Sequence, residues 1–187
     1  MTNSSTAEIN PLAGLAAFVF PGAGHLLLGR PKRAALICVG VMGLFLFGLL
    51  IGGIDAIDHR DHKVWFIGEA LVGLPTIAVD AVHQSKYKAY DLNTSTLRAG
   101  YPGEQRVVEN GRAVWKPLSD QEISAGLGPP NVPGLGRINE IAMLSIVLAG
   151  MLNLIVFLDA LMPTPEPAKK NAARNPPTPP AGGEGPS

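Results

Sequence analysis

Residues 34–53 read AALICVGVMGLFLFGLLIGG, a run of twenty residues without a charged side chain. At about 1.5 Å of rise per residue, a helix of this length spans the apolar core of a bilayer, which is about 30 Å thick. The segment is therefore predicted to be a transmembrane helix. The chain that contains it is predicted to be a membrane protein, and its other apolar segments become candidate spans.

Composition supports this prediction. The chain has 187 residues, of which 47% are hydrophobic and 16% charged, whereas soluble domains carry about 25% charged residues. The formal net charge is zero, which argues against a nucleic-acid partner because no overall basic field exists. The single cysteine, Cys38, excludes an intrachain disulfide and a CxxC metal site.

Three further apolar segments cover residues 11–29, 64–82 and 138–162. The first is interrupted at Pro21-Gly22, where proline removes a backbone donor and disfavours helical geometry in the preceding residue. Two interpretations stay open for this segment: a kinked span, or a short helix that enters the membrane and returns. In the last segment, Asn153 is predicted to make a hydrogen bond between helices.

We therefore expect an all-α fold: a polytopic helical membrane protein with three or four transmembrane segments, a small cytoplasmic loop region and a disordered C-terminal tail. The expected divisions are a polar N-terminal segment (1–10), a helical membrane region (11–82, with segments 11–29, 34–53 and 64–82), a polar loop appendage (83–137), a last transmembrane helix (138–162) and a Pro-rich tail (163–187). No internal repeat supports an inverted-repeat transporter.

The appendage contains local structural signals. The stretch RVVENGRAVW predicts a β-hairpin, with Asn110-Gly111 suited to a type I′ turn. Ser119 and Glu122 form a capping-box pattern that predicts a short helix. Four earlier residues are expected to continue the third apolar helix through the headgroup region: Lys86, Tyr87, Lys88 and Tyr90.

The basic residues predict an orientation. Arg30, Lys32 and Arg33 follow the first apolar segment, and the 55-residue appendage contains seven further lysines and arginines. If segments 34–53 and 64–82 both cross, these two basic regions share one side, which the positive-inside rule assigns to the cytoplasm.

Four glycines in the second segment, Gly40, Gly43, Gly48 and Gly52, lie at helical spacing. Glycines at such spacing allow another helix to approach closely, so a helix-packing face is predicted. The alternative is that glycine is simply frequent in membrane helices.

The stretch FPGAGHLLLGRPKR, residues 20–33, combines a helix breaker with an ionisable ring. Broken backbone inside a bilayer needs partners within the protein or in a water-filled pocket. One interpretation is a polar node, with His25 and Arg30 binding a lipid headgroup or small ligand. The other is structural: the glycines make a turn, His25 bonds a freed carbonyl, and RPKR anchors to anionic lipid.

At these residues the chain resembles the small two-transmembrane domain family, whose signature is G-x-G-x-H followed by L-G-[RK]. The matching positions are Gly22, Gly24, His25, Leu28, Gly29 and Arg30. The resemblance implies a later-helix aspartate, to which Asp80 corresponds; Leu26-Leu27 replaces the family's usual aromatic pair. The whole layout also resembles an uncharacterised integral membrane family of planctomycete bacteria. Both resemblances imply a helical membrane protein of unknown role.

Other polar residues are candidates for chemistry. His59 and His62, in the DHRDH loop, have spacing compatible with a divalent metal, although a solvated loop gives the same pattern. Glu69 and Asp80 lie within an apolar segment, where ionisable groups are functional candidates. An intramembrane aspartyl protease is not expected, because neither aspartate has the YD or GxGD context. No P-loop, dinucleotide-binding glycine pattern or nucleophile elbow is present.

The sequence thus predicts a multi-pass protein of the bacterial inner membrane, not an enzyme and without a cofactor. Its predicted role is a membrane interaction or assembly module, with the lipid bilayer and a membrane protein or second copy as partners. The alternative is a small transporter or a lipid- or ion-binding protein that uses His25, Arg30, Glu69 and Asp80.

Overall fold

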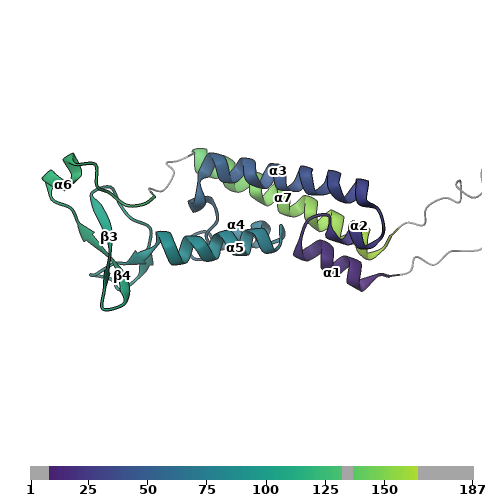
Figure 1. The fold of residues 1–187 in the computed structure, drawn as a ribbon, viewed down its shortest axis with the longest axis horizontal. Coiled ribbons are helices and arrows are strands. Elements are labelled where there is room, and N and C mark those ends of the chain that lie inside the picture. Colours follow the sequence, from purple (N-terminus) through teal and green to yellow (C-terminus); the bar gives the residue numbers. More distant parts are fainter. Residues whose placement is uncertain (1–8, 132–136, 164–187) are drawn as a thin grey trace, which may run out of the picture.

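A computed structural model describes residues 9–131 and 137–163. Two long helices, α3 (Pro31–Gly52) and α7 (Arg137–Leu161), run side by side along the long axis of the molecule (Figure 1). The helices predicted over 34–53 and 138–162 are confirmed, with boundaries shifted by up to three residues. The predicted tail at 163–187 lies, apart from Pro163, outside the described residues.

The first apolar segment is a helical hairpin, α1 (Pro11–Val19) and α2 (Ala23–Leu27). Asn10 caps α1 through its side chain, and Pro11 occupies a position where no backbone donor is needed. The chain reverses at Pro21-Gly22, where Gly22 has a φ of 87° that only glycine adopts readily. The segment therefore turns back on itself, which excludes the kinked span, one of the two interpretations left open by the sequence.

The third apolar segment is a second helical hairpin, α4 (Lys63–Ala70) and α5 (Leu74–Val82). Gly73 makes the reversal with a φ of 98°, and Pro75 lies in the first turn of α5. A 3-10 turn, Ile54–Ala56, connects α3 to the loop before α4.

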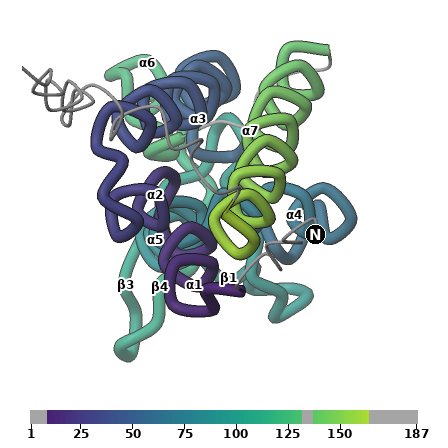
Figure 2. Tube along the Cα trace, turned by 90° about the vertical axis from the view of Figure 1, so that its right-hand side faces the viewer, coloured from purple at the N-terminus to yellow at the C-terminus, as the bar shows by residue number. Residues whose placement is uncertain are grey.

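The two hairpins approach from opposite ends of the long helices and meet tip to tip (Figure 1). A Cβ on Gly73 would overlap the carbonyl oxygens of Phe18 and Val19, so the tips are in direct contact. Asn153 of α7 joins them: its Nδ2 donates to the carbonyl of Ala17 at 3.2 Å and to that of Leu71 at 2.9 Å. Figure 2 shows the first hairpin in front of α5.

Beyond α5 the chain makes a π-helical turn, His83–Tyr87, and enters a small sheet. The strands are β1 (Ala89–Tyr90), β2 (Leu97–Arg98), β3 (Glu104–Glu109) and β4 (Arg112–Pro117), in the order β2-β1-β4-β3. Only the β1–β4 pair is parallel. The helical continuation expected through Lys88 and Tyr90 is therefore wrong.

Two local predictions in this region are confirmed. Strands β3 and β4 form an antiparallel hairpin, and Asn110 and Gly111 have φ values of 50° and 78°, as a type I′ turn requires. Ser119 and Glu122 form a reciprocal capping box at the start of α6 (Asp120–Ser124).

The expected all-α fold with three or four transmembrane segments is wrong. The described residues contain a four-stranded sheet, and only α3 and α7 are long and apolar enough to cross a membrane. Segments 11–29 and 64–82 have the length and hydropathy of spans, but positive-φ glycines reverse each of them. Hydropathy alone does not distinguish a helix that continues from one that turns back.

This correction changes the predicted orientation. Because α4 and α5 form a hairpin, the chain returns to the end of α3 that it left. Arg30, Lys32 and Arg33 lie at one end of α3, whereas the sheet lies beyond the other end (Figure 1). We call the first the tail end and the second the sheet end. The prediction that both basic regions share one side required segments 34–53 and 64–82 both to cross. Segment 64–82 turns back instead, so this requirement is not met.

Candidate functional site

A buried polar cluster lies at the sheet end, where the loop after α3 meets the turn after α5. The Lys88 ammonium is fully buried and contacts the carboxylates of Asp58 and Asp61, the latter at 2.7 Å. The Gln84 side chain also donates to Asp58, at 2.9 Å. Burial, the largest influence, raises the pKa of Asp58, but Lys88 and the other donors outweigh it and lower that pKa well below its usual range. The cluster thus holds a buried ion pair.

Asp80 of α5 belongs to this cluster. Its Oδ2 lies 2.7 Å from Nδ1 of His59, and its Oδ1 accepts from the His59 backbone amide at 3.2 Å. His62 lies elsewhere, in an open groove between α4 and α7 that Glu140 also lines. Across residues 9–131 and 137–163, no group of three or more His, Cys, Asp and Glu side chains is placed to hold a metal.

His83 occupies the centre of the junction between helices and sheet. Its Nδ1 lies 3.0 Å from the carbonyl of Ile57, and its Nε2 lies 2.9 Å from Oδ1 of Asp55. Both partner oxygens are acceptors and Asp55 is a carboxylate, so the pair favours a protonated ring. The Nε2–Oδ1 contact has the distance of an ion pair but not the geometry of a hydrogen bond. Burial lowers the pKa of His83, but the contacts with Asp55 and Ile57 outweigh it and raise that pKa overall. Asn131 donates to the other oxygen of Asp55, at 2.7 Å.

At the tail end, His25 of α2 pairs with Asp159 of α7, Nε2 to Oδ2, at 2.8 Å. The His25 ring is fully buried, and the Arg33 guanidinium lies 3.9 Å from the same carboxylate oxygen. The expectation that His25 bonds a carbonyl freed by the helix break is therefore wrong. Its partner is a side chain from the far end of the sequence.

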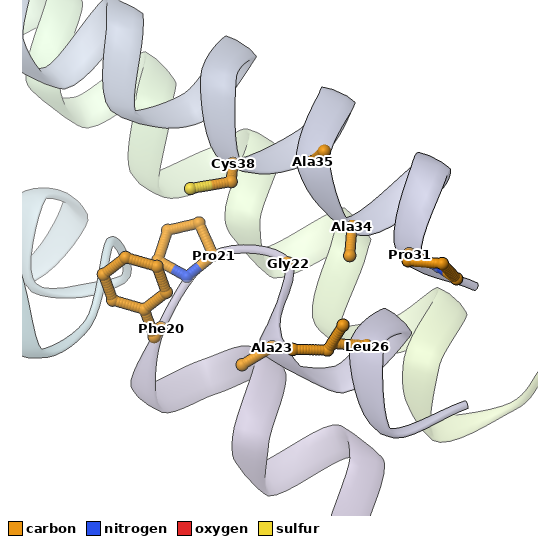
Figure 3. Close-up of a pocket in the computed structure, with 9 residues that line it drawn as sticks. All are labelled: Phe20, Pro21, Gly22, Ala23, Leu26, Pro31, Ala34, Ala35 and Cys38. Atoms are coloured by element: carbon orange, nitrogen blue, oxygen red, sulfur yellow. The ribbon is translucent and has the colours of Figure 1, made fainter. Parts of the chain in front are cut away.

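The PGAGH turn itself lines an apolar pocket of about 300 Å³ rather than a polar one (Figure 3). It is bounded by the turn on one side and by the first two turns of α3 on the other. The lining residues are Phe20, Pro21, Gly22, Ala23, Leu26, Pro31, Ala34, Ala35 and Cys38. His25 and Arg30 do not line this pocket.

Glu69 lies between the two ends, in the last turn of α4. The preceding residue, Gly68, packs against Gly150, the fourteenth of the 25 residues of α7. The Glu69 side chain is completely buried, and neither carboxylate oxygen has a hydrogen-bond partner among the described residues. Thr76 of α5 donates to the backbone carbonyl of Glu69, at 2.8 Å, rather than to its carboxylate.

The four residues predicted to act together in a transporter or binding protein do not all meet. His25 and Arg30 are neighbours at the tail end, where the Arg30 amide donates to the His25 carbonyl at 2.9 Å. Asp80 lies at the sheet end and Glu69 between the two ends. The sequence indicated no role for His83 and predicted Lys88 in the headgroup region, because nothing local indicates that a lysine after an apolar segment will be buried. Asp58 was considered only as part of the DHRDH loop.

The four glycines of α3 fall into two pairs. A Cβ on Gly48 would lie 2.6 Å from Ile146, and one on Gly52 would overlap Ala142, both on α7. A Cβ on Gly40 or Gly43 would meet nothing within 4 Å. The first pair therefore sets the close approach of α3 and α7, and the second lies on the outer surface.

A family model matches residues 12–172, under the description of a family of unknown function, DUF6677. The chain belongs to this family. The DUF6677 match runs from α1 past the end of α7, so both hairpins, the sheet and both long helices lie within it. No curated protein and no solved structure matches the chain.

Proposed function

We propose that this DUF6677 protein is a non-enzymatic integral membrane protein of the bacterial inner membrane, crossed twice by the chain. The observation that carries the proposal is the outer surface of the long helices. Within the apolar 18-residue stretch of each long helix, only 22% of the residues of α3 and 33% of those of α7 are buried. A core helix of a soluble protein buries most of its apolar surface, whereas one in lipid does not need to.

The hairpins fit the same environment. Helices α1 and α4 have nine and eight residues, about 13 Å and 12 Å of length. Placed tip to tip they extend about as far as one span. Broken backbone at that depth is tolerated where protein surrounds it, and Asn153 provides partners for the carbonyls at both tips.

Within the membrane, the proposed role is an interaction module. The open surface at Gly40 and Gly43 suits close approach of another membrane helix, from a partner or a second copy. The sheet projects beyond the bundle and offers a second contact surface. The chain's resemblances to the two-transmembrane domain signature and to the planctomycete membrane family support membrane insertion. They do not indicate a specific partner.

Two experiments test the proposal. Membranes washed with alkaline carbonate retain the protein if it is integral; its release into the wash contradicts membrane insertion. In a Cys38→Ala background, Gly43→Cys is expected to form crosslinked products in native membranes. The comparison is Met42→Cys, a half-buried position that lies about 100° around α3 from Gly43. Equal crosslinking at both positions contradicts a specific contact at the glycine face.

A second candidate function is a small transporter or ion-binding protein. The buried carboxylate of Glu69 favours it, because ionisable groups deep in membrane proteins are expensive and often functional. Hairpins that meet near the middle of a bundle are also a recurrent site of ion binding in transporters. Flux of an ion across vesicles that contain the purified protein tests this candidate.

A further inference from the structure

Glu69 is a buried acid that neither the packing nor the ion pairs of the structure use. Its carboxylate oxygens have no hydrogen-bond partner among the described residues, and the side chain has no solvent exposure. Its neighbour Gly68 contacts the middle of α7, about 20 Å from the first residue of that helix at 1.5 Å per residue. The group therefore lies deep, away from both ends of the bundle.

The charges that reach Glu69 do not compensate a negative charge. They come from Asp58 and Asp80, which are carboxylates themselves. The basic side chains that contact these aspartates are already paired with them, Lys88 with Asp58 and the His59 ring with Asp80. A buried carboxylate anion without a donor or cation is strongly disfavoured, so the group holds a proton instead.

A proton fits this site better than a metal cation does. Metal ions take several oxygen or nitrogen ligands, and the described part of the chain offers no group of three or more ligating His, Cys, Asp and Glu side chains. A single carboxyl group is sufficient to bind one proton. The chemistry of the site is therefore that of a lone acid.

Polar groups lead from Glu69 toward the sheet end. Thr76, whose hydroxyl reaches the backbone of Glu69, is followed one turn later on α5 by Asp80. Residues four apart lie on the same helix face. Asp80 in turn contacts His59 at 2.7 Å, and the His59 side chain is 41% exposed. Asp80 therefore lies one turn of α5 from Thr76, and its partner His59 reaches solvent.

We propose that Glu69 is a proton-binding site inside the bundle and exchanges its proton with solvent at the sheet end through Asp80 and His59. Uptake moves one proton from solvent to the Asp80–His59 pair and on to a carboxylate oxygen of Glu69; release is the reverse, and no electron is transferred. The inference rests on the membrane-embedded architecture proposed above and deepens its ion-binding alternative.

Infrared spectroscopy of the purified protein in phosphatidylcholine vesicles tests the binding site. The wild type is expected to show a carboxylic C=O band that shifts in D₂O and is lost in Glu69→Gln. Glu140→Gln, the same change at an exposed position of α7, keeps the band. Glu69→Asp is expected to move it, which gives a second readout if the glutamine variant does not accumulate. Identical spectra for wild type and both Glu69 variants overturn the proposal.

The route is tested by the rate at which D₂O shifts that band. Asp80→Asn and His59→Ala are expected to slow the shift while the band itself remains. An unchanged rate in both variants overturns the route. The same measurements in detergent distinguish a failure of this proposal from a failure of the proposed membrane insertion. The infrared band reports the protonation of Glu69, whereas the carbonate wash reports insertion.

Discussion

The Nε2 atom of His25 lies 2.8 Å from Oδ2 of Asp159, and this contact joins residues 134 positions apart in the chain. It fixes α2 against the last turn of α7, where the Asn10 amide also donates to the Leu161 carbonyl at 2.8 Å. The first hairpin is therefore held at its open end, while its tip rests against the second hairpin.

Replacing His25 with alanine is expected to loosen this attachment. The change removes a buried partner of Asp159 and lowers the free energy of unfolding by about 1 to 3 kcal/mol. Thermal unfolding in a mild detergent measures it. Leu26→Ala, at an exposed position of the same helix, is the control and should change stability by less than about 0.5 kcal/mol. Equal losses in the two variants would contradict a specific role for the pair.

Gly48 and Gly40 provide a matched pair on one helix. Gly48→Leu is expected to push α7 away from α3, because even a Cβ there approaches Ile146 within 2.6 Å; overpacking of this kind costs about 1 to 3 kcal/mol. Gly40→Leu meets open space and should leave bundle stability unchanged or higher by up to about 1 kcal/mol, since glycine is a poor helix former. Detergent melting temperatures compare them, and a larger loss for Gly40→Leu would contradict the packing described.

The buried ion pair at the sheet end predicts a large effect for one lysine. Lys88→Met leaves Asp58 buried without its cation and should lower the free energy of unfolding by about 3 to 5 kcal/mol. Lys116→Met removes the lysine of the half-exposed Lys116–Glu109 pair and should cost less than about 1 kcal/mol. Chemical unfolding of the two variants measures the difference, and similar losses would show that Lys88 is not buried in the folded protein.

The raised pKa of His83 predicts how stability depends on pH. Its pKa is raised in the folded protein, so its contribution is complete below the ordinary value of about 6.5 and is lost as pH rises through the higher folded value. The stability difference between wild type and His83→Gln should therefore be largest below about pH 6.5 and shrink above it. A difference that grows with rising pH would contradict the protonated ring.

Labelling from one side of the membrane tests the hairpin architecture. In a Cys38→Ala background, Lys32→Cys lies at the tail end and Val108→Cys on strand β3 at the sheet end, both at exposed positions. A maleimide that does not cross membranes should label only one of them in intact cells and both after lysis. Labelling of both positions, or of neither, in intact cells would contradict their placement on opposite sides of the membrane.

The sequence by itself determined the features that depend on neighbouring residues. Twenty uncharged residues predict α3 because helix length and hydropathy are local properties. Asn110-Gly111 predicts its turn because few residues adopt positive φ, and Ser119 with Glu122 predicts α6 because a capping box spans only four positions. These predictions required no knowledge of the rest of the chain.

Only the tertiary structure decided where the broken segments go and which charges meet. A proline or glycine in an apolar segment permits a kink or a reversal, and the choice depends on what satisfies the freed carbonyls. Here the side chain of Asn153, eighty or more residues away from both tips, donates hydrogen bonds to carbonyls at each of them. The pairs His25–Asp159 and Lys88–Asp58 are likewise set by packing, since side chains distant in sequence have no local pattern that identifies their partners.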